Sequence, residues 1–164
     1  MLYVSVAGEV STRNLLNVFL NKKSVWIPRY NGHELEAVSI QSLDDLCEGM
    51  FGIPEPPRFL LPLSEPCSLD VVVVPGVAFD KNAHRLGRGK GCYDRFLSRM
   101  GEIPLRVGLA FDAQVLDKLP LSEHDQPVDV VITETSLYYN AASAYKTAGV
   151  FSSCKPLLRF PSLS

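Results

Sequence analysis

The sequence predicts a single α/β domain, a three-layer α/β/α sandwich whose central sheet is mainly parallel. Residues 70–74 contain four consecutive valines without alternation, which is typical of a strand covered on both faces. Two similar apolar runs follow at 105–111 and 128–133, and a helical pattern precedes the first of them. The length of 164 residues, 46% of them hydrophobic, suits one domain with a sizeable core. Strands that alternate with helices favour right-handed crossovers within one sheet.

The elements before the valine run are expected to be short. We predict a strand at 2–6, then a helix whose apolar face includes Leu15 and Leu20, capped by the Ser11-Thr12 pair. Two further strands are expected on either side of a turn at Asn31-Gly32, and a short helix is expected after them; these are residues 24–28, 36–40 and 42–48.

Five prolines between residues 49 and 66 predict an ordered surface loop, because proline cannot donate to a strand ladder. After the valine run, a helix is expected from about Gly91, with an apolar stripe at Tyr93, Phe96, Leu97 and Met100. Beyond the last strand we expect a short helix over 141–148. The predicted organisation is one α/β domain at 1–140 and a loosely ordered tail at 141–164.

Composition excludes several functional classes. Sixteen basic and eighteen acidic residues leave a net charge of −2, which argues against a broad nucleic-acid-binding face. No run reaches the roughly 20 apolar residues that cross a bilayer. The first eight residues lack the basic region of a signal peptide. We therefore expect a cytoplasmic monomer with small-molecule substrates and with neither nucleic-acid nor membrane partners.

The four cysteines are widely spaced, at positions 47, 67, 92 and 154, with no C-x-x-C pair. A zinc knuckle needs two close ligand pairs, and the three histidines do not supply the missing ones. Reduced thiols are therefore expected.

The segment 79–95 follows the valine strand, at the sheet edge where ligands bind in open α/β folds. Gly87, Gly89 and Gly91 alternate with Arg88 and Lys90. Glycine lets backbone N–H groups approach an anion, and the basic side chains neutralise one, so the pattern favours a polyphosphate. The spacing fits neither Walker A nor G-x-G-x-x-G. A solvated glycine turn remains the alternative from spacing alone.

Asp94 falls in the first turn of the helix that follows, away from its apolar stripe and beside the glycine turn. The positive end of that helix would face a bound anion. A carboxylate beside phosphates is a natural ligand for Mg²⁺.

These residues resemble the signature of the 5-formyltetrahydrofolate cyclo-ligase family. The central motif is PGVAFD at 75–80, RLGRGKG at 85–91 and YDR at 93–95. The similarity extends to IPRY at 27–30, GIPEP at 52–56 and DQPVD at 125–129, and it runs in order over residues 2–134.

The resemblance implies an ATP- and Mg²⁺-dependent conversion of 5-formyltetrahydrofolate to 5,10-methenyltetrahydrofolate, with release of ADP and phosphate. The γ-phosphoryl group would move to the formyl oxygen, which then leaves as phosphate while N10 closes the ring. Positioning and charge neutralisation dominate such phosphoryl transfer, so no protein nucleophile is expected.

The resemblance also implies a set of site residues. Those expected to contact ATP are Arg85, Leu86, Gly87, Arg88, Gly89, Lys90, Gly91, Cys92 and Tyr93, of which Arg88 and Lys90 would act in catalysis. Those expected to contact the folate are Val4 and Glu9, together with Arg88, Gly89, Lys90, Gly91 and Cys92. The magnesium carboxylates are expected to be Asp94 and Asp125.

Three departures from the family pattern matter. A basic helical segment normally precedes the first strand, Cys92 stands where Tyr is usual, and Ala83 stands where Gly is usual. They keep open an alternative, a shortened and catalytically impaired isoform that binds folate or nucleotide without turnover. A second alternative is an RNA-binding module built on the Arg-Gly turn; the net charge and the lack of an aromatic RNP pattern argue against it.

Overall fold

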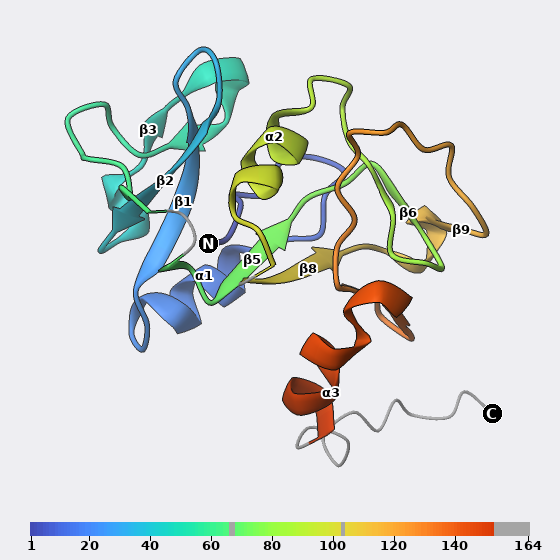
Figure 1. Ribbon diagram of the computed structural model, residues 1–164. Helices are drawn as coiled ribbons and strands as arrows, with labels where there is room; N and C mark the ends of the chain where they lie inside the picture. The colour runs from blue at the N-terminus through green and yellow to red at the C-terminus, as the bar shows by residue number, and fades with distance from the viewer. Residues whose placement is uncertain (66–67, 103, 153–164) are drawn as a thin grey trace.

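The computed structural model describes residues 1–65, 68–102 and 104–152. Its central sheet has the strand order β11-β10-β8-β5 (Figure 1). The strands are β5 (Val71–Val74), β8 (Leu105–Leu109), β10 (Val130–Ile132) and β11 (Leu137–Tyr139). The first three are mutually parallel and β11 pairs antiparallel at the edge. The prediction of an α/β fold with a mainly parallel sheet is confirmed.

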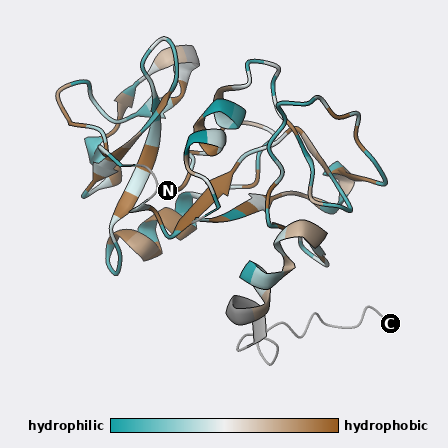
Figure 2. Cartoon of the chain, viewed as in Figure 1, coloured by the Kyte–Doolittle hydropathy of each residue, from teal (hydrophilic) through white to brown (hydrophobic). Residues whose placement is uncertain are grey.

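Strand β5 is covered on both faces, as its uninterrupted valines predict. Val72 and Val74 join a core that includes Phe96 and Leu97 of helix α2 (Cys92–Arg99). Val73 joins a second core that includes Leu16 of helix α1 (Arg13–Leu20). Figure 1 shows α2 above the sheet and α1 below it, and the strand is apolar along its length in Figure 2.

The predicted strand at 2–6 is wrong. Met1 O accepts from Val73 N at 2.9 Å and Leu2 N donates to Trp26 O at 2.9 Å, so the segment begins between β5 and the hairpin described next. A turn closed by Glu9 N to Val6 O then leads the chain away, and too few ladder bonds form to make a strand.

A hairpin of β1 (Val25–Tyr30) and β2 (Leu35–Ile40) stands beside the central sheet. The proline-rich loop is ordered against it, since Leu63 N donates to Ala37 O at 2.7 Å. The expected helix at 42–48 is wrong beyond one short 3₁₀ turn, η1 (Leu43–Asp45). Residues after that turn pair instead as β3 (Cys47–Glu48) with β4 (Pro54–Glu55), and η2 (Met50–Gly52) connects these two strands.

A small three-stranded sheet carries the start of the glycine-rich segment. Its order is β7-β6-β9, formed by β6 (Ala78–Asp80), β7 (Arg85–Leu86) and β9 (Val115–Leu116), with η4 (Asp112–Gln114) before β9. Phe79 is fully buried and fits against the backbone of Gly76 and Gly108, where a Cβ atom would lie 2.6 Å from its ring. This packing fixes the small sheet against β8.

The expected short helix near the C-terminus is confirmed as η5 (Ala141–Ser143) followed by α3 (Ala144–Ser152). The rest of the predicted tail, 153–164, lies outside the described residues, and the division at residue 140 stays a prediction. In the described part of the chain, no helix combines the length and apolar content needed to cross a membrane.

Arg29 anchors the proline-rich loop, and its loss should destabilise the fold. Its guanidinium, 4% exposed, binds Glu36 at 2.9 Å and the carbonyls of Pro57 and Leu60 at 2.6 and 3.0 Å. Arg29→Met removes these hydrogen bonds and leaves the Glu36 carboxylate without its buried cation, so we expect a loss of about 3–5 kcal/mol in the free energy of unfolding, measured by urea denaturation. Lys81→Met, which removes an exposed ion pair with Asp117, should leave the midpoint unchanged. Equal effects of the two substitutions would contradict this assignment.

Candidate active site

The turn between β6 and β7 is built around the buried carboxylate of Asp80. It accepts the backbone N–H groups of Asn82 and His84 at 2.9 Å each and that of Leu119 at 3.2 Å. The His84 ring contributes Nδ1, 2.9 Å from Oδ2. Ala83, at the tip, has a φ of +62° and is fully buried. This left-handed conformation gives a physical reason why glycine suits the position.

Burial by itself would raise the pKa of Asp80, but the hydrogen bonds from His84, Leu119 and Asn82 together hold that pKa below its ordinary value. The carboxylate is therefore charged in the folded protein at neutral pH. It fixes the position of the strand that leads into the glycine turn.

The glycine turn itself needs glycine for two different reasons. Gly89 and Gly91 have φ values of +85° and +59°, in the left-handed region that other residues avoid. At Gly87, a Cβ atom would lie 2.7 Å from Nη1 of Arg85. Helix α2 begins immediately after Gly91, so its N-terminal N–H groups adjoin the turn, as predicted.

Arg85 points into the protein. Its Nη2 donates to Asp94 Oδ1 at 2.7 Å, and its guanidinium lies over the ring of Tyr93, 5.8 Å from the centroid. The side chain is 4% exposed, and its Nε has no hydrogen-bond partner among the described residues. Arg85 thus ties the glycine turn to the first turn of α2.

Tyr93 is half-buried here, and this burial raises the pKa of its phenol.

Asp94 and Asp125 are carried by neighbouring elements. Asp94 Oδ1 also accepts the backbone N–H of Gln126 at 3.1 Å, which brings the residue after Asp125 against α2. Asp125 Oδ2 accepts from Ser122 N at 2.7 Å. In the described contacts, Asp94 Oδ2 and Asp125 Oδ1 have no hydrogen-bond partner.

These two oxygens fit the chemistry of Mg²⁺, which takes one or two carboxylates and completes its shell with phosphate oxygens and water. Among the residues that the structure describes, no cluster of three or more His, Cys, Asp and Glu side chains is arranged to hold a metal.

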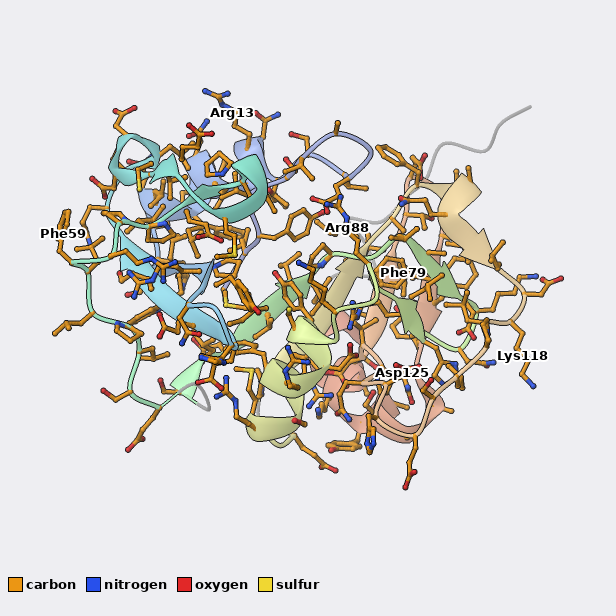
Figure 3. The ribbon with its side chains drawn as sticks, turned by 90° about the horizontal axis from the view of Figure 1, so that it is seen from above. Arg13, Phe59, Phe79, Arg88, Lys118 and Asp125 are labelled. Carbon is orange, nitrogen blue, oxygen red and sulfur yellow. The ribbon has the colours of Figure 1, made fainter. Side chains whose placement is uncertain are left out.

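Glu9 meets the glycine turn from the other side. Its Oε1 accepts from Arg88 Nη2 at 3.1 Å, and its Oε2 accepts from Val6 N at 3.1 Å. The Glu9 side chain is 14% exposed, whereas that of Arg88 is 58% exposed. Figure 3 views the molecule from above. Arg88 lies near the middle of this view, and Phe79 and Asp125 both lie on the right of it.

The remaining predicted residues differ in how they are held. Lys90 is exposed, and its carbonyl accepts from Arg95 Nη1 at 2.9 Å. The half-buried Cys92 places its Sγ 3.9 Å from the same carbonyl. Leu86 is exposed. Val4 packs against the core on the α1 side of the sheet.

Sequence reasoning missed the polar residues that join α2 to the 125–129 segment. Arg106 and Asp129 are buried, and Arg106 N donates to Asp129 Oδ2 at 2.8 Å. The signal was present, because a charged residue inside an apolar strand must find a partner. Gln126 had no such signal, since its contact with Asp94 uses only the backbone.

The charge on Asp80 predicts a pH dependence of stability. Because its folded pKa is lowered, its contribution is complete above the unfolded pKa of about 3.9 and is lost as the pH falls through the folded value. In Asp80→Asn the amide N–H₂ group would face backbone N–H groups that the carboxylate now accepts. We therefore expect the free energy of unfolding at pH 7 to fall by about 2 kcal/mol or more. Its stability should also fall less steeply than that of the wild type below about pH 4. Parallel acid profiles of the two proteins in thermal denaturation would exclude this role.

Comparison with known proteins shows the family to which this chain belongs. The model of the 5-formyltetrahydrofolate cyclo-ligase family matches residues 1–134. The chain is 32% identical to the 5-formyltetrahydrofolate cyclo-ligase of Mus musculus, over 82% of this chain and 72% of the relative, and 35% identical to that of Haemophilus influenzae, over 80% and 73%. The NMR structure of Aquifex aeolicus 5,10-methenyltetrahydrofolate synthetase superimposes with a TM-score of 0.74 at 38% identity, covering 85% of this chain and 70% of that one. The chain therefore belongs to the 5-formyltetrahydrofolate cyclo-ligase family.

Proposed function

We propose that this chain converts 5-formyltetrahydrofolate to 5,10-methenyltetrahydrofolate at the expense of ATP. The γ-phosphoryl group is transferred to the formyl oxygen, which makes the formyl carbon electrophilic. N10 then attacks that carbon and loses its proton, and the oxygen departs as phosphate, leaving ADP.

The observation that carries this proposal is the contact between Glu9 and Arg88. The two side chains are 79 residues apart in sequence and 3.1 Å apart in space. On the motif resemblance, we assign Glu9 to the folate and Arg88 to the phosphates, and the reaction needs the formyl oxygen beside the γ-phosphate. Holding two reactants in attack geometry is the main source of rate in such a transfer.

Charge at the glycine turn suits the phosphate end of ATP. Arg88 and Lys90 are exposed at the start of α2, where the helix N–H groups add positive potential. We propose that both side chains neutralise the transferred phosphoryl group. Arg85 has another task, since its buried pair with Asp94 holds the turn in place.

We propose that Asp94 and Asp125 hold Mg²⁺ through the two oxygens that have no protein partner in the described contacts. Bound Mg²⁺ would neutralise and orient the β- and γ-phosphates. The other oxygen of each carboxylate, Asp94 Oδ1 and Asp125 Oδ2, is already held by a backbone N–H group.

The direct test is ATP-dependent appearance of methenyl-folate absorbance from 5-formyltetrahydrofolate. Lys90→Ala should lower kcat by about 10²-fold, the cost of losing one transition-state donor, with an unchanged melting temperature. Lys118→Ala is the matched control, because Lys118 is an exposed lysine at the periphery, far from Arg88 in Figure 3.

Absence of product from the wild type, together with binding of 5-formyltetrahydrofolate in calorimetry, would support the alternative of a binding protein without turnover. Normal turnover in Lys90→Ala would reject the phosphate role of the glycine turn.

The magnesium assignment has its own test in Asp125→Asn. The asparagine oxygen can still accept from Ser122 N, so the loop is retained, while an N–H₂ group replaces the oxygen proposed to face the metal. We expect the Mg²⁺ concentration for half-maximal rate to rise about ten-fold or more. Glu123→Gln, an exposed acid in the same loop, should behave like the wild type. If the Mg²⁺ concentration for half-maximal rate is the same in both variants, the assignment of Asp125 as a magnesium ligand is wrong.

A further inference from the structure

Arg106 in β8 is a buried arginine that reaches the end of α2. The residue is 9% exposed. Its Nη2 donates to the carbonyls of Leu97 and Gly101, at 2.9 and 2.7 Å. These carbonyls lie at the C-terminal end of α2, where a cation is favourable; Leu97 O also accepts from Met100 N at 3.2 Å.

The other nitrogen of the same guanidinium reaches the segment that follows Asp125. Nη1 lies 3.4 Å from Gln126 Oε1 and 3.5 Å from the carbonyl of Pro127. The backbone N–H of Arg106 donates to Asp129 Oδ2 at 2.8 Å. Arg106 therefore contacts the C-terminal end of α2 and also residues 126–129, which directly precede β10.

Keeping this side chain buried is costly. Its Nε is buried without a hydrogen-bond partner among the described residues, and burial lowers the pKa of the guanidinium. Asp129 offsets part of the charge and is itself paired with Lys146 at 3.4 Å. A well-packed apolar residue at this strand position would cost less free energy, so we expect the buried arginine to have a role other than stability.

The two elements that Arg106 contacts are the two that carry the proposed magnesium ligands. Asp94 lies in the first turn of α2, and Asp125 immediately precedes Gln126. Gln126 N donates to Asp94 Oδ1, so a shift of the 125–127 segment would disturb both carboxylates together.

We propose that Arg106 is a positioning residue for the magnesium site, holding the Asp125 segment at a fixed distance from Asp94 by binding α2 and residues 126–127 with one guanidinium. The inference rests on the proposed function, because the site it serves is the proposed one. Arg106 touches neither substrate nor metal in this arrangement, and its effect is transmitted through the two elements.

A matched control is available on the same helix. Arg99 also anchors α2, through an ion pair with Glu34 and a hydrogen bond of 3.1 Å to the carbonyl of Leu35. It holds α2 to the β1–β2 hairpin, and its described contacts do not include the 125–129 segment. Arg99→Met therefore loosens α2 without touching the connection that Arg106 makes.

The experiment measures ADP affinity by calorimetry, once with Mg²⁺ and once with EDTA, so that the metal contribution is the ratio of the two Kd values. In Arg106→Met we expect this ratio to fall about ten-fold, as for the loss of an outer partner of a metal ligand, with the EDTA value within about two-fold of wild type. Arg99→Met should keep the wild-type ratio. Arg106→Lys, whose single ammonium cannot bridge both elements, should give an intermediate ratio, and it replaces the methionine variant if that does not fold.

Two results would overturn the inference while leaving the proposed function intact. One is a wild-type ratio in Arg106→Met. The other is an equal loss of ADP affinity with and without Mg²⁺, which indicates a general structural role. If wild-type ADP affinity does not respond to Mg²⁺ at all, the proposed metal site fails, and the role of Arg106 fails with it.

Discussion

One carboxylate oxygen, Asp94 Oδ1, is the point on which the site depends. It accepts from Arg85 Nη2 at 2.7 Å and from Gln126 N at 3.1 Å. Through it, the glycine turn, helix α2 and the 122–127 loop are held together. The pair with Arg85 is largely desolvated, so removing either partner would leave a buried charge uncompensated at a cost of about 3–5 kcal/mol. The geometry of all three segments follows from this junction.

The sheet explains why such a junction forms at this place. Strand β5 is covered on both faces and runs directly into the 75–91 segment, whose Phe79 is buried against the glycines at 76 and 108. Any side chain larger than hydrogen at those glycines would collide with the ring. Packing in the core therefore fixes where the small β7-β6-β9 sheet lies, and hence where the glycine turn emerges.

The sequence predicted the parts of the fold that local pattern determines. The valine strand, the two later parallel strands and the stripe of α2 are confirmed, because burial on both faces gives the strands continuous apolar runs and burial on one face gives α2 its helical stripe. The strand at 2–6 and the helix at 42–48 were wrong, since their states depend on remote partners: Trp26 and Val73 for the first, β4 for the second. In the site, the motif identified the loop, but no local pattern announces that Arg85 turns inward or that Arg88 meets Glu9.

The two arginines of the glycine turn differ in what it costs to move them. Arg88 is 58% exposed and holds one ion pair, a contact worth about 0–1 kcal/mol in such surroundings. Arg85 is 4% exposed, and its displacement would leave the largely buried Asp94 carboxylate without its cation. Arg88 can therefore be displaced from Glu9 at small cost, while Arg85 keeps the glycine turn fixed to helix α2. Glycine at 87 suits this arrangement, because a Cβ atom there would lie 2.7 Å from Nη1 of Arg85 and would push the guanidinium from its present position.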